Sequence, residues 1–297
     1  MRDPDPILLT GASGYVGSHL LDELLRRGRH VRALMRDPAP GKLPAEVDAR
    51  KGDAVAGTGL ADALEGCRTA YYLIHSMGSG AGVAAEFARR DREAAVNFGE
   101  AARDAGVERT IYLGGLGDDT SSEHLRSRHE VAELLRQRTP GFVYVRAAMI
   151  IGSGSASFEM LRHLTRRLPV MITPRWLNTR SQPVAIPDVA SALAALAELP
   201  EAPAEVQLGG ADVLSYRDMI RRTASAMGRR SPLVIPVPLL TPRLSSHWVA
   251  LVTPVDVGLV RPLIDGLKEE MIVVNAPPAG INDHPLGFDR AVREALA

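Results

Sequence analysis

The chain has 297 residues, enough for one large domain or for two unequal ones. Lysine plus arginine and aspartate plus glutamate balance at 35 each, so the basic excess typical of nucleic-acid-binding proteins is missing and we expect no nucleic-acid partner. Cys67 is the only cysteine, which excludes an intrachain disulfide and indicates a reducing, cytoplasmic compartment. The longest nearly uncharged stretch, Leu244–Val260, is broken by Pro254 and Asp256, so we expect no membrane span.

Strand and helix patterns alternate through the first half of the chain. Apolar and aromatic runs predict strands at Ile7–Thr10, His30–Met35, Val47–Asp53, Thr69–Ser76, Thr110–Gly115 and Phe142–Gly152. Helical patterns occur at Tyr15–Gly28, Leu60–Gly66, Val83–Ala105 and Ser122–Arg138. Because each crossover must carry the chain back over the sheet, this alternation predicts an α/β fold with a doubly wound parallel sheet of the Rossmann type.

From about Ser155 onward the pattern changes. Proline becomes frequent, and short strand-like segments are separated by helices predicted at Pro187–Leu199 and Ser215–Met227. We therefore expect residues 1–154 to form a dinucleotide-binding domain. Residues 155–297 are expected to form a smaller substrate lobe, interleaved with the last strands of the sheet.

Three glycines follow the first predicted strand, in the sequence TGASGYVG. Gly11 permits a tight turn, Gly14 lets the backbone approach a pyrophosphate, and Gly17 allows the helix to pack closely on the strand. The pyrophosphate would lie at the helix N-terminus, where free amides and the helix dipole favour negative charge. The candidate cofactor site includes the other residues of this turn, Ser13, Tyr15 and Val16. The alternative is a glycine-rich turn that binds nothing.

The end of the second predicted strand indicates which nucleotide is preferred. An acidic residue there holds the ribose hydroxyls of NAD, whereas an arginine suits the 2′-phosphate of NADP. The strand ends in Arg36, and Asp37 follows immediately. Arg36 favours NADP(H) over NAD(H), Asp37 weakens that preference, and a solvated surface arginine is the alternative for Arg36.

Beyond the glycine turn, the chain carries an ordered set of motifs: VRALMRDP, AYYLIHSM, IYLGGLG, VRAAMIIGSGSASF and QPVAIPDVASAL. In this order it resembles the extended and atypical short-chain dehydrogenase/reductases, and in particular their NAD(P)H-binding, NmrA-like and sugar-epimerase-like branches. The resemblance is close over Ile7–Leu199 and looser beyond it.

The resemblance implies further contacts with the cofactor. Asp53, with Ala54 beside it, would hydrogen-bond the adenine amino group. The residues that would line the riboses and the nicotinamide carboxamide are Ile74, His75, Ser76, Gly114, Ala147, Ala148 and Met149. Asp188 matches a family aspartate, and its place just after a proline indicates a structural role at a helix N-terminus.

The chain departs from the family at the catalytic residues. The resemblance implies a serine after the fifth strand and a Tyr-x-x-x-Lys pair on the next helix. The chain has Gly114 and Gly115 in the first place, and His124 and Arg128 in the second. His124 could act as a general acid or base, and Arg128 could donate to the ribose but cannot relay a proton, because it stays charged. His124, Arg128 and His75 are the catalytic candidates; the alternative is a solvated helix face without chemistry.

Other polar residues suggest less chemistry. Ser153, Ser155 and Ser157 predict a mobile or phosphate-approaching loop. His124 and His129 are five residues apart, which places them on different helix faces, and we expect no metal site.

The leading hypothesis is an NADP(H)-dependent oxidoreductase that acts on a small, partly apolar carbonyl, enone or imine-like substrate. The substrate-lining candidates, for which core packing is the alternative, are Met77, Gly115, Met160, Met171, Trp176, Asn178 and Arg180. A non-catalytic NADP(H)-sensing or scaffold protein is the second hypothesis, and an epimerase or isomerase with retained NAD(P) is the third. By the resemblance, the helices Val83–Ala105 and Glu123–Arg138 could form a homodimer interface.

Overall fold

The computed structural model describes residues 5–75, 83–117, 123–167, 170–173, 175–236 and 269–297. The strands are β1 (Ile7–Thr10), β2 (Val31–Met35), β3 (Asp48–Lys51), β4 (Thr69–Tyr72), β5 (Arg109–Gly115), β6 (Phe142–Ala147), β7 (Ile150–Ile151), β8 (Val170–Thr173), β9 (Arg180–Ser181), β10 (Val184–Ala185), β11 (Glu205–Leu208), β12 (Leu214–Ser215) and β13 (Leu233–Pro236). The helices are α1 (Tyr15–Arg26), α2 (Leu60–Leu64), α3 (Val83–Asp104), α4 (Glu123–Arg136), α5 (Ala156–Arg167), the 3-10 helix η1 (Arg175–Asn178), α6 (Ile186–Glu198), α7 (Tyr216–Ala226) and α10 (Phe288–Leu296).

The central sheet has seven strands in the order β11-β6-β5-β4-β1-β2-β3, and each neighbouring pair is parallel. The strand order reverses between β1 and β4. At such a switch point, a doubly wound sheet opens a crevice outside the carboxyl ends of its strands. The predicted Rossmann-type parallel sheet is confirmed.

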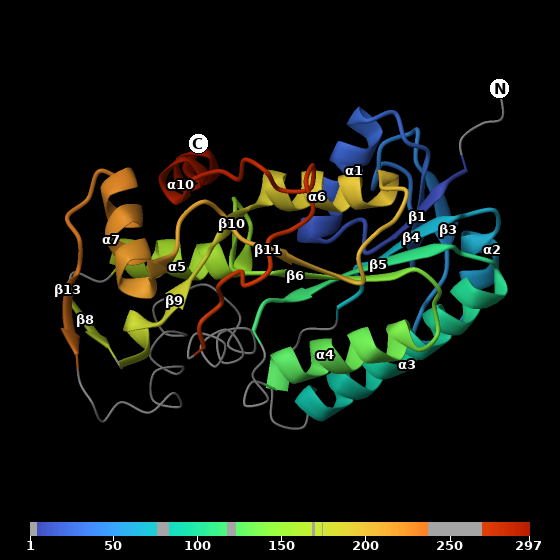
Figure 1. The fold of residues 1–297 in the computed structure, drawn as a ribbon, viewed down its shortest axis with the longest axis horizontal. Helices are drawn as coiled ribbons and strands as arrows, with labels where there is room; N and C mark the ends of the chain where they lie inside the picture. The colour runs from blue at the N-terminus through green and yellow to red at the C-terminus, as the bar shows by residue number, and fades with distance from the viewer. Residues whose placement is uncertain (1–4, 76–82, 118–122, 168–169, 174, 237–268) are drawn as a thin grey trace.

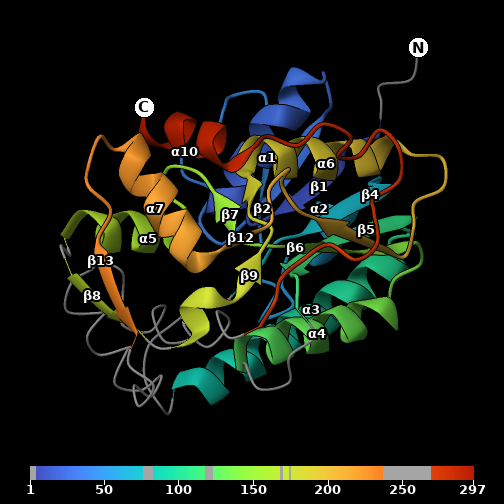
Figure 2. The same ribbon diagram turned by 60° about the vertical axis from the view of Figure 1, so that its left-hand side comes forward.

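Alternating side chains along the strands fill two hydrophobic layers, one on each face of the sheet. Leu9 of β1 faces α1 and α6, together with Leu24 and Leu193. The adjacent Leu8 faces the other way, into the layer that contains Phe98 of α3 and Leu135 of α4. Figures 1 and 2 show α1 and α6 on one side of the sheet and α3 and α4 on the other.

Residues after β6 contribute both to this sheet and to a separate core. β11 adds the outer strand beside β6, and α6 packs against α1 on the sheet. In contrast, α5, α7 and α10 pack around Phe158, Met219 and Phe288, beside the sheet (Figure 1). None of the helices within the described ranges is long and apolar enough to span a membrane.

Two strands differ in their bounds from the prediction. β4 ends at Tyr72, before its predicted end, because the Leu73 N–H donates to the Thr10 side chain (2.9 Å) and leaves the ladder. The predicted strand Phe142–Gly152 is divided into two. β6 ends at Ala147, and Ile150–Ile151 form the separate strand β7, which pairs with β10.

The loop predicted around Ser153, Ser155 and Ser157 is wrong in its second half. Ala156 and Ser157 already belong to α5, whose apolar side chains, including Phe158, recur at helical spacing and are buried. The Ser155 hydroxyl donates to the Ile150 carbonyl at 2.7 Å and is buried. This hydroxyl therefore joins the residue before α5 to β7.

Candidate functional site

The turn between β1 and α1 depends on glycine. Gly11 has a φ of 70°, a left-handed conformation that favours glycine, and a Cβ there would lie 2.8 Å from the Leu73 carbonyl oxygen. A Cβ at Gly17 would lie 2.0 Å from the Gly11 carbonyl oxygen. Glycine at both positions therefore lets α1 begin directly against the end of β1.

The outer side of the same turn is open to a ligand. Gly14 is the N-cap of α1, and it has no side chain to accept from the amides of the first turn. Among the described residues, a Cβ at Gly14 would approach only the Gly11 carbonyl oxygen, at 3.1 Å. Ser13 is exposed on this side, and Tyr15 and Val16 are the first two residues of α1. This arrangement fits a pyrophosphate at the helix N-terminus.

The Tyr15 side chain packs away from the turn. A Cβ at Gly152 would lie 2.1 Å from the Tyr15 hydroxyl, and the ring also packs on Gly154 and on the edge of His19. Burial raises the pKa of Tyr15 to about 12, with a smaller contribution from Glu159. The phenol therefore joins α1 to the segment after β7, and only the Tyr15 backbone lies at the turn.

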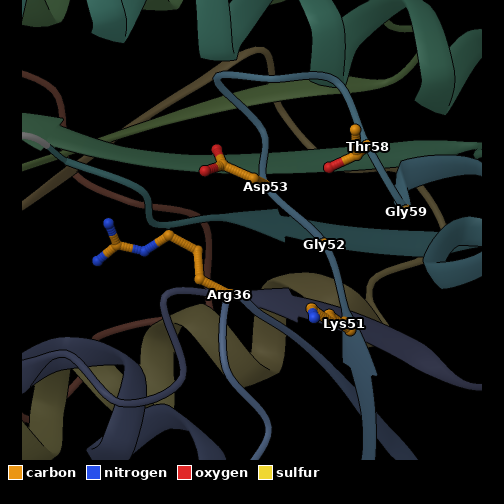
Figure 3. Close-up of a pocket in the computed structure, with 6 residues that line it drawn as sticks. All are labelled: Arg36, Lys51, Gly52, Asp53, Thr58 and Gly59. Atoms are coloured by element: carbon orange, nitrogen blue, oxygen red, sulfur yellow. The ribbon is translucent and has the colours of Figure 1, made fainter.

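A pocket of about 320 Å³ lies at the carboxyl ends of β2 and β3. Its lining residues, drawn in Figure 3, are Arg36, Lys51, Gly52, Asp53, Thr58 and Gly59. Arg36 directly follows β2, and Lys51 ends β3 opposite Met35. In Figure 3 the Arg36 and Asp53 side chains extend to the same side of the pocket.

Arg36 and Lys51, the two cations of this pocket, differ in their ion pairing from the neighbouring arginines of β2 and β3. Arg32 is paired with Asp48 at 2.7 Å, and Arg50 with the same carboxylate at 2.8 Å. Within the part of the chain that the structure describes, neither Arg36 nor Lys51 has an ion-pair partner. Two residues that line the pocket are therefore cations, the kind of charge that a phosphate requires.

Asp53, the acidic residue that lines the pocket, lies in a tight turn. Asp53 accepts a hydrogen bond from the Val55 amide at 2.8 Å and pairs through its backbone with Thr58. The Asn97 side chain of α3 donates to the carbonyl oxygens of Ala54 (3.0 Å) and Val55 (2.9 Å). The turn is thus fixed to the sheet and to α3, with Ala54 buried.

Several other candidates lie at the same edge of the sheet. Ile74 and His75 are half-buried just after β4, while Ser76 and Met77 lie outside the described residues. Gly114 and Gly115 end β5, opposite Arg146 and Ala147 at the end of β6. Ala147, Ala148 and Met149 are buried. Parallel topology alone brings these carboxyl ends together.

The space where a serine side chain would begin at Gly114 is filled. A Cβ there would lie 2.6 Å from both Cε2 and Oη of Tyr144. The Tyr144 hydroxyl lies 3.2 Å from His129 Nδ1, and His129 Nε2 lies 2.9 Å from the Gly117 carbonyl oxygen. Since that carbonyl can only accept, His129 Nε2 carries a proton and donates it to the Gly117 carbonyl oxygen. At Gly115, in contrast, a Cβ would meet only the flexible end of Leu125, at 2.7 Å, among the described residues.

Arg128 is turned toward the end of β5. It donates to the Leu113 carbonyl oxygen at 3.1 Å and also hydrogen-bonds the Tyr112 hydroxyl. Burial raises the pKa of Tyr112 to about 12, and Arg128 opposes that rise. His124 lies in the first turn of α4, outside the residues whose side chains the structure describes.

The candidates of the second lobe lie in different environments. Met160 is 5% exposed and belongs to the core around α5, which agrees with the core-packing alternative. Asn178 is exposed, and Arg180 pairs with Glu270 at 2.7 Å. The side chains of Met171 and Trp176 lie outside the described ones.

Potential metal ligands do not gather in the described ranges, where no group of three or more His, Cys, Asp or Glu side chains could hold an ion. Cys67 is buried, and burial raises the pKa of its thiol. This thiol is therefore held in its protonated form.

Sequence reasoning missed Lys51 and Tyr144. Lys51 had a usable signal, because a cation at the end of the third strand lies beside the end of the second in a doubly wound sheet. Tyr144 had none, since its approach to Gly114 depends on the register of β5 and β6.

A family model described as NAD(P)H-binding matches residues 11–161, which is more than half of the chain. The match begins at Gly11 of the β1–α1 turn and runs through β6 into α5. It therefore includes the glycine turn, the pocket beside β2 and β3, and the ends of β4, β5 and β6.

Curated relatives are reductases and dehydrogenases. Ceramide reductase of Caulobacter vibrioides is 29% identical over 265 residues, which cover 85% of this chain and 81% of that protein. A 3-beta-hydroxysteroid dehydrogenase of Mycolicibacterium neoaurum is 35% identical over 113 residues, 36% of this chain and 31% of that protein. The similarity thus spans less than a third of the hydroxysteroid dehydrogenase.

Solved structures share the fold along nearly the whole chain. The NADPH complex of the quinone oxidoreductase QOR2 from Escherichia coli superimposes with a TM-score of 0.76 at 18% identity, covering 98% of this chain and 100% of that one. This likeness shows a shared fold, and the family match over more than half of the chain decides the classification. The chain belongs to the NAD(P)H-binding family, within the atypical short-chain dehydrogenase/reductases.

Proposed function

We propose that the protein is an NADP(H)-dependent oxidoreductase. The observation that carries the preference for NADP(H) is the pair of cations at the ends of β2 and β3. Arg36 and Lys51 line one pocket, and within the described residues neither has an ion-pair partner. A 2′-phosphate would give both cations a partner, whereas the ribose hydroxyl of NAD would leave both uncompensated.

The remaining contacts follow the carboxyl edge of the sheet. The amides at the start of α1, beside Gly14, would hold the pyrophosphate. Asp53 would meet the adenine amino group, with Ala54 beside it. The segments after β4 and β6 would line the riboses and the nicotinamide, through Ile74, His75, Ser76, Ala147, Ala148 and Met149. When bound, the nicotinamide supplies or accepts the hydride.

Proton transfer is the step left to the protein. His124, in the first turn of α4, and His75, after β4, are the proposed acid–base residues, because a histidine can change charge near neutral pH. Arg128 stays charged and cannot relay a proton, so its proposed role is to orient the ribose of the cofactor. Its bonds to Leu113 and Tyr112 support that role, since they fix the end of β5.

The proposed substrate is a small, partly apolar carbonyl, enone or imine-like compound. Residues 155–297 would supply its wall as a substrate lobe next to the dinucleotide-binding residues 1–154. Of the described candidates, Asn178 and Arg180 are exposed in this lobe, and Gly115 is half-buried at the end of β5. Two similar proteins, a ceramide reductase and a quinone oxidoreductase, favour a reductase.

Cofactor titration tests this proposal directly. NADPH and NADH are titrated into the protein while nicotinamide fluorescence is followed. We expect Arg36→Ala and Lys51→Ala each to weaken NADPH binding about tenfold, as for the loss of a charged hydrogen bond, and to leave NADH binding nearly unchanged. Arg50→Ala is the matched control, because Arg50 is already paired with Asp48. Equal binding of NADPH and NADH by the wild-type protein would refute the preference.

A non-catalytic NADP(H) sensor is the second candidate. The observation that favours it is Tyr144, whose phenol occupies the space in front of Gly114. A protein of this kind would bind NADPH without oxidising it in the presence of any aldehyde, ketone, quinone or enone. NADPH consumption across such a panel, abolished by His124→Ala, would decide for the enzyme.

A further inference from the structure

Asp37 lies next to the proposed 2′-phosphate site and has the wrong charge for it. It directly follows Arg36, and its side chain is 80% exposed. An acidic residue at the end of the second strand favours the ribose hydroxyls of NAD and repels a phosphate. The preference for NADP(H) therefore depends on how this carboxylate is compensated.

The structure compensates it with a nearby lysine. Lys42 Nζ donates to the Asp37 carboxylate at 2.7 Å and to the Asp37 carbonyl oxygen at 3.0 Å. Lys42 is the main cause of the lowered pKa of Asp37, and Lys51 adds a smaller contribution. The carboxylate thus stays ionised and is matched by a cation of its own.

A short turn presents Lys42 to Asp37. The Ala39 amide donates to the Asp37 carbonyl oxygen at 3.0 Å, and the Lys42 amide donates to the Ala39 carbonyl oxygen at 3.3 Å. Gly41 has a φ of 80°, which reverses the chain just before Lys42, and Pro38 and Pro40 restrict the residues between. Because Asp37 and Lys42 are only five positions apart in the chain, the ion pair forms at little cost in chain entropy.

We propose that Lys42 is a specificity-determining residue, which keeps the site selective for NADP(H) by neutralising Asp37. This inference rests on the proposed function, since it assumes that Arg36 and Lys51 receive the 2′-phosphate. Without Lys42, the Asp37 carboxylate would be free to pair with Arg36 and to accept from a ribose hydroxyl. Both changes favour NADH over NADPH.

The expected effect is modest, because both side chains are at the surface. Exposed ion pairs contribute little and are screened by salt, so we expect Lys42→Ala to lower the ratio of NADPH to NADH affinity about two- to fivefold at low salt. The effect should shrink as the salt concentration rises.

A double-mutant cycle tests the proposal with cofactor binding alone. Dissociation constants for NADPH and NADH are measured for the wild-type protein, Lys42→Ala, Asp37→Asn and the double variant, with circular dichroism as the check on folding. We expect Lys42→Ala to lower the affinity ratio, Asp37→Asn to change it little, and the double variant to return to the wild-type ratio. Lys42→Arg, which keeps the cation, should keep the ratio.

The outcomes separate the two proposals. If Lys42→Ala leaves the ratio unchanged while Arg36→Ala lowers it, the role of Lys42 is refuted and the proposed function stands. If the double variant stays as low as Lys42→Ala, Lys42 acts on the phosphate directly and not through Asp37, which also refutes the inference. If the wild-type protein has no preference for NADPH, both proposals fall.

Discussion

Gly114 is enclosed on the side where a family serine would begin. The register of β5 and β6 places Tyr112 opposite Tyr144, and the Tyr144 ring reaches along the sheet to Gly114. Tyr112 and Tyr144 stack with ring centroids 5.5 Å apart, and His129 holds the Tyr144 hydroxyl. The phenol is therefore fixed on two sides and cannot easily make room for a larger residue at 114.

Substitution of Gly114 by serine tests whether the Tyr144 ring leaves room for a side chain at this position. We expect Gly114→Ser to lower the free energy of unfolding by about 1–3 kcal/mol, as for overpacking in a core. Gly115→Ser is the matched control, with a smaller loss, because the Leu125 side chain that it would meet can rotate. Urea unfolding of both variants measures the difference. A Gly114→Ser variant as stable as the wild-type protein would mean that Tyr144 moves aside.

At the scale of elements, α6 is joined to the segment before α10 by an acid in its first turn. The N-cap Ala185 offers no side-chain acceptor, and Asp188 accepts from the Leu286 amide at 2.8 Å. Burial raises the pKa of Asp188, while the bond to Leu286 opposes the rise. The family position thus has a structural contact here, with a distant segment of the chain.

The raised pKa predicts a pH dependence of stability. The folded chain holds the Asp188 proton more tightly than the unfolded chain. This contribution to stability is therefore complete below the ordinary carboxyl pKa and is lost as the pH rises through the raised value. Asp188→Asn keeps an acceptor for Leu286 without a charge, so its stability relative to wild type should increase from about pH 3 to about pH 7.

Urea unfolding across that pH range checks the prediction. Asp289→Asn, at an exposed carboxylate in the first turn of α10, is the control, and its difference from wild type should not follow the same course. A pH-independent difference for Asp188→Asn would contradict the burial argument.

At the scale of the whole molecule, the segment from residue 269 to α10 passes β9 and the sheet strand β11 before it reaches the core around Phe158 and Phe288 (Figure 2). Gln207 of β11 accepts from the amides of Val274 (2.9 Å) and Asn275 (3.3 Å). Gln182 accepts from the Val273 amide at 3.1 Å and donates to the Gly210 carbonyl oxygen at 2.7 Å. Two glutamine side chains therefore attach the end of the chain to both parts of the molecule.

We expect Gln207→Ala to destabilise this attachment by about 1–3 kcal/mol, because it leaves two amides without their acceptor. The free energy of unfolding from urea titration and the rate of proteolysis within residues 269–287 measure the loss. Val274→Ser is the control in the same segment; Val274 is 83% exposed, and we expect a change within about 0.5 kcal/mol. Equal effects of the two substitutions would contradict the role of Gln207.

The homodimer expected through α3 and α4 stays a prediction. The exposed side chains of these helices form ion pairs, such as Arg89 with Glu86 at 2.6 Å and Arg92 with Glu130 at 3.2 Å. A surface of this kind is well solvated as a monomer. An interface there would have to place these charges at its rim.

Much of the fold could be predicted because its signals are local. The six-residue spacing from Gly11 to Gly17 and the alternating strand and helix patterns specify the β1–α1 unit and the sheet without any distant contact. α5 was missed because its first residues, in GSGSAS, favour a loop. The helical spacing of its apolar residues from Phe158 onward was a local signal, and the tertiary structure shows that this face is buried.

By itself, the sequence determined the fold class, the glycine turn and the cation at the end of β2, since turn chemistry and periodicity act between residues close in the chain. Only the tertiary structure decided that Lys51 shares the Arg36 pocket, that Lys42 rather than Arg36 pairs with Asp37, and that Tyr144 fills the space at Gly114. Two of these contacts depend on how separate strands align, and the third depends on how a turn closes. Side-chain distances of this kind are set by packing.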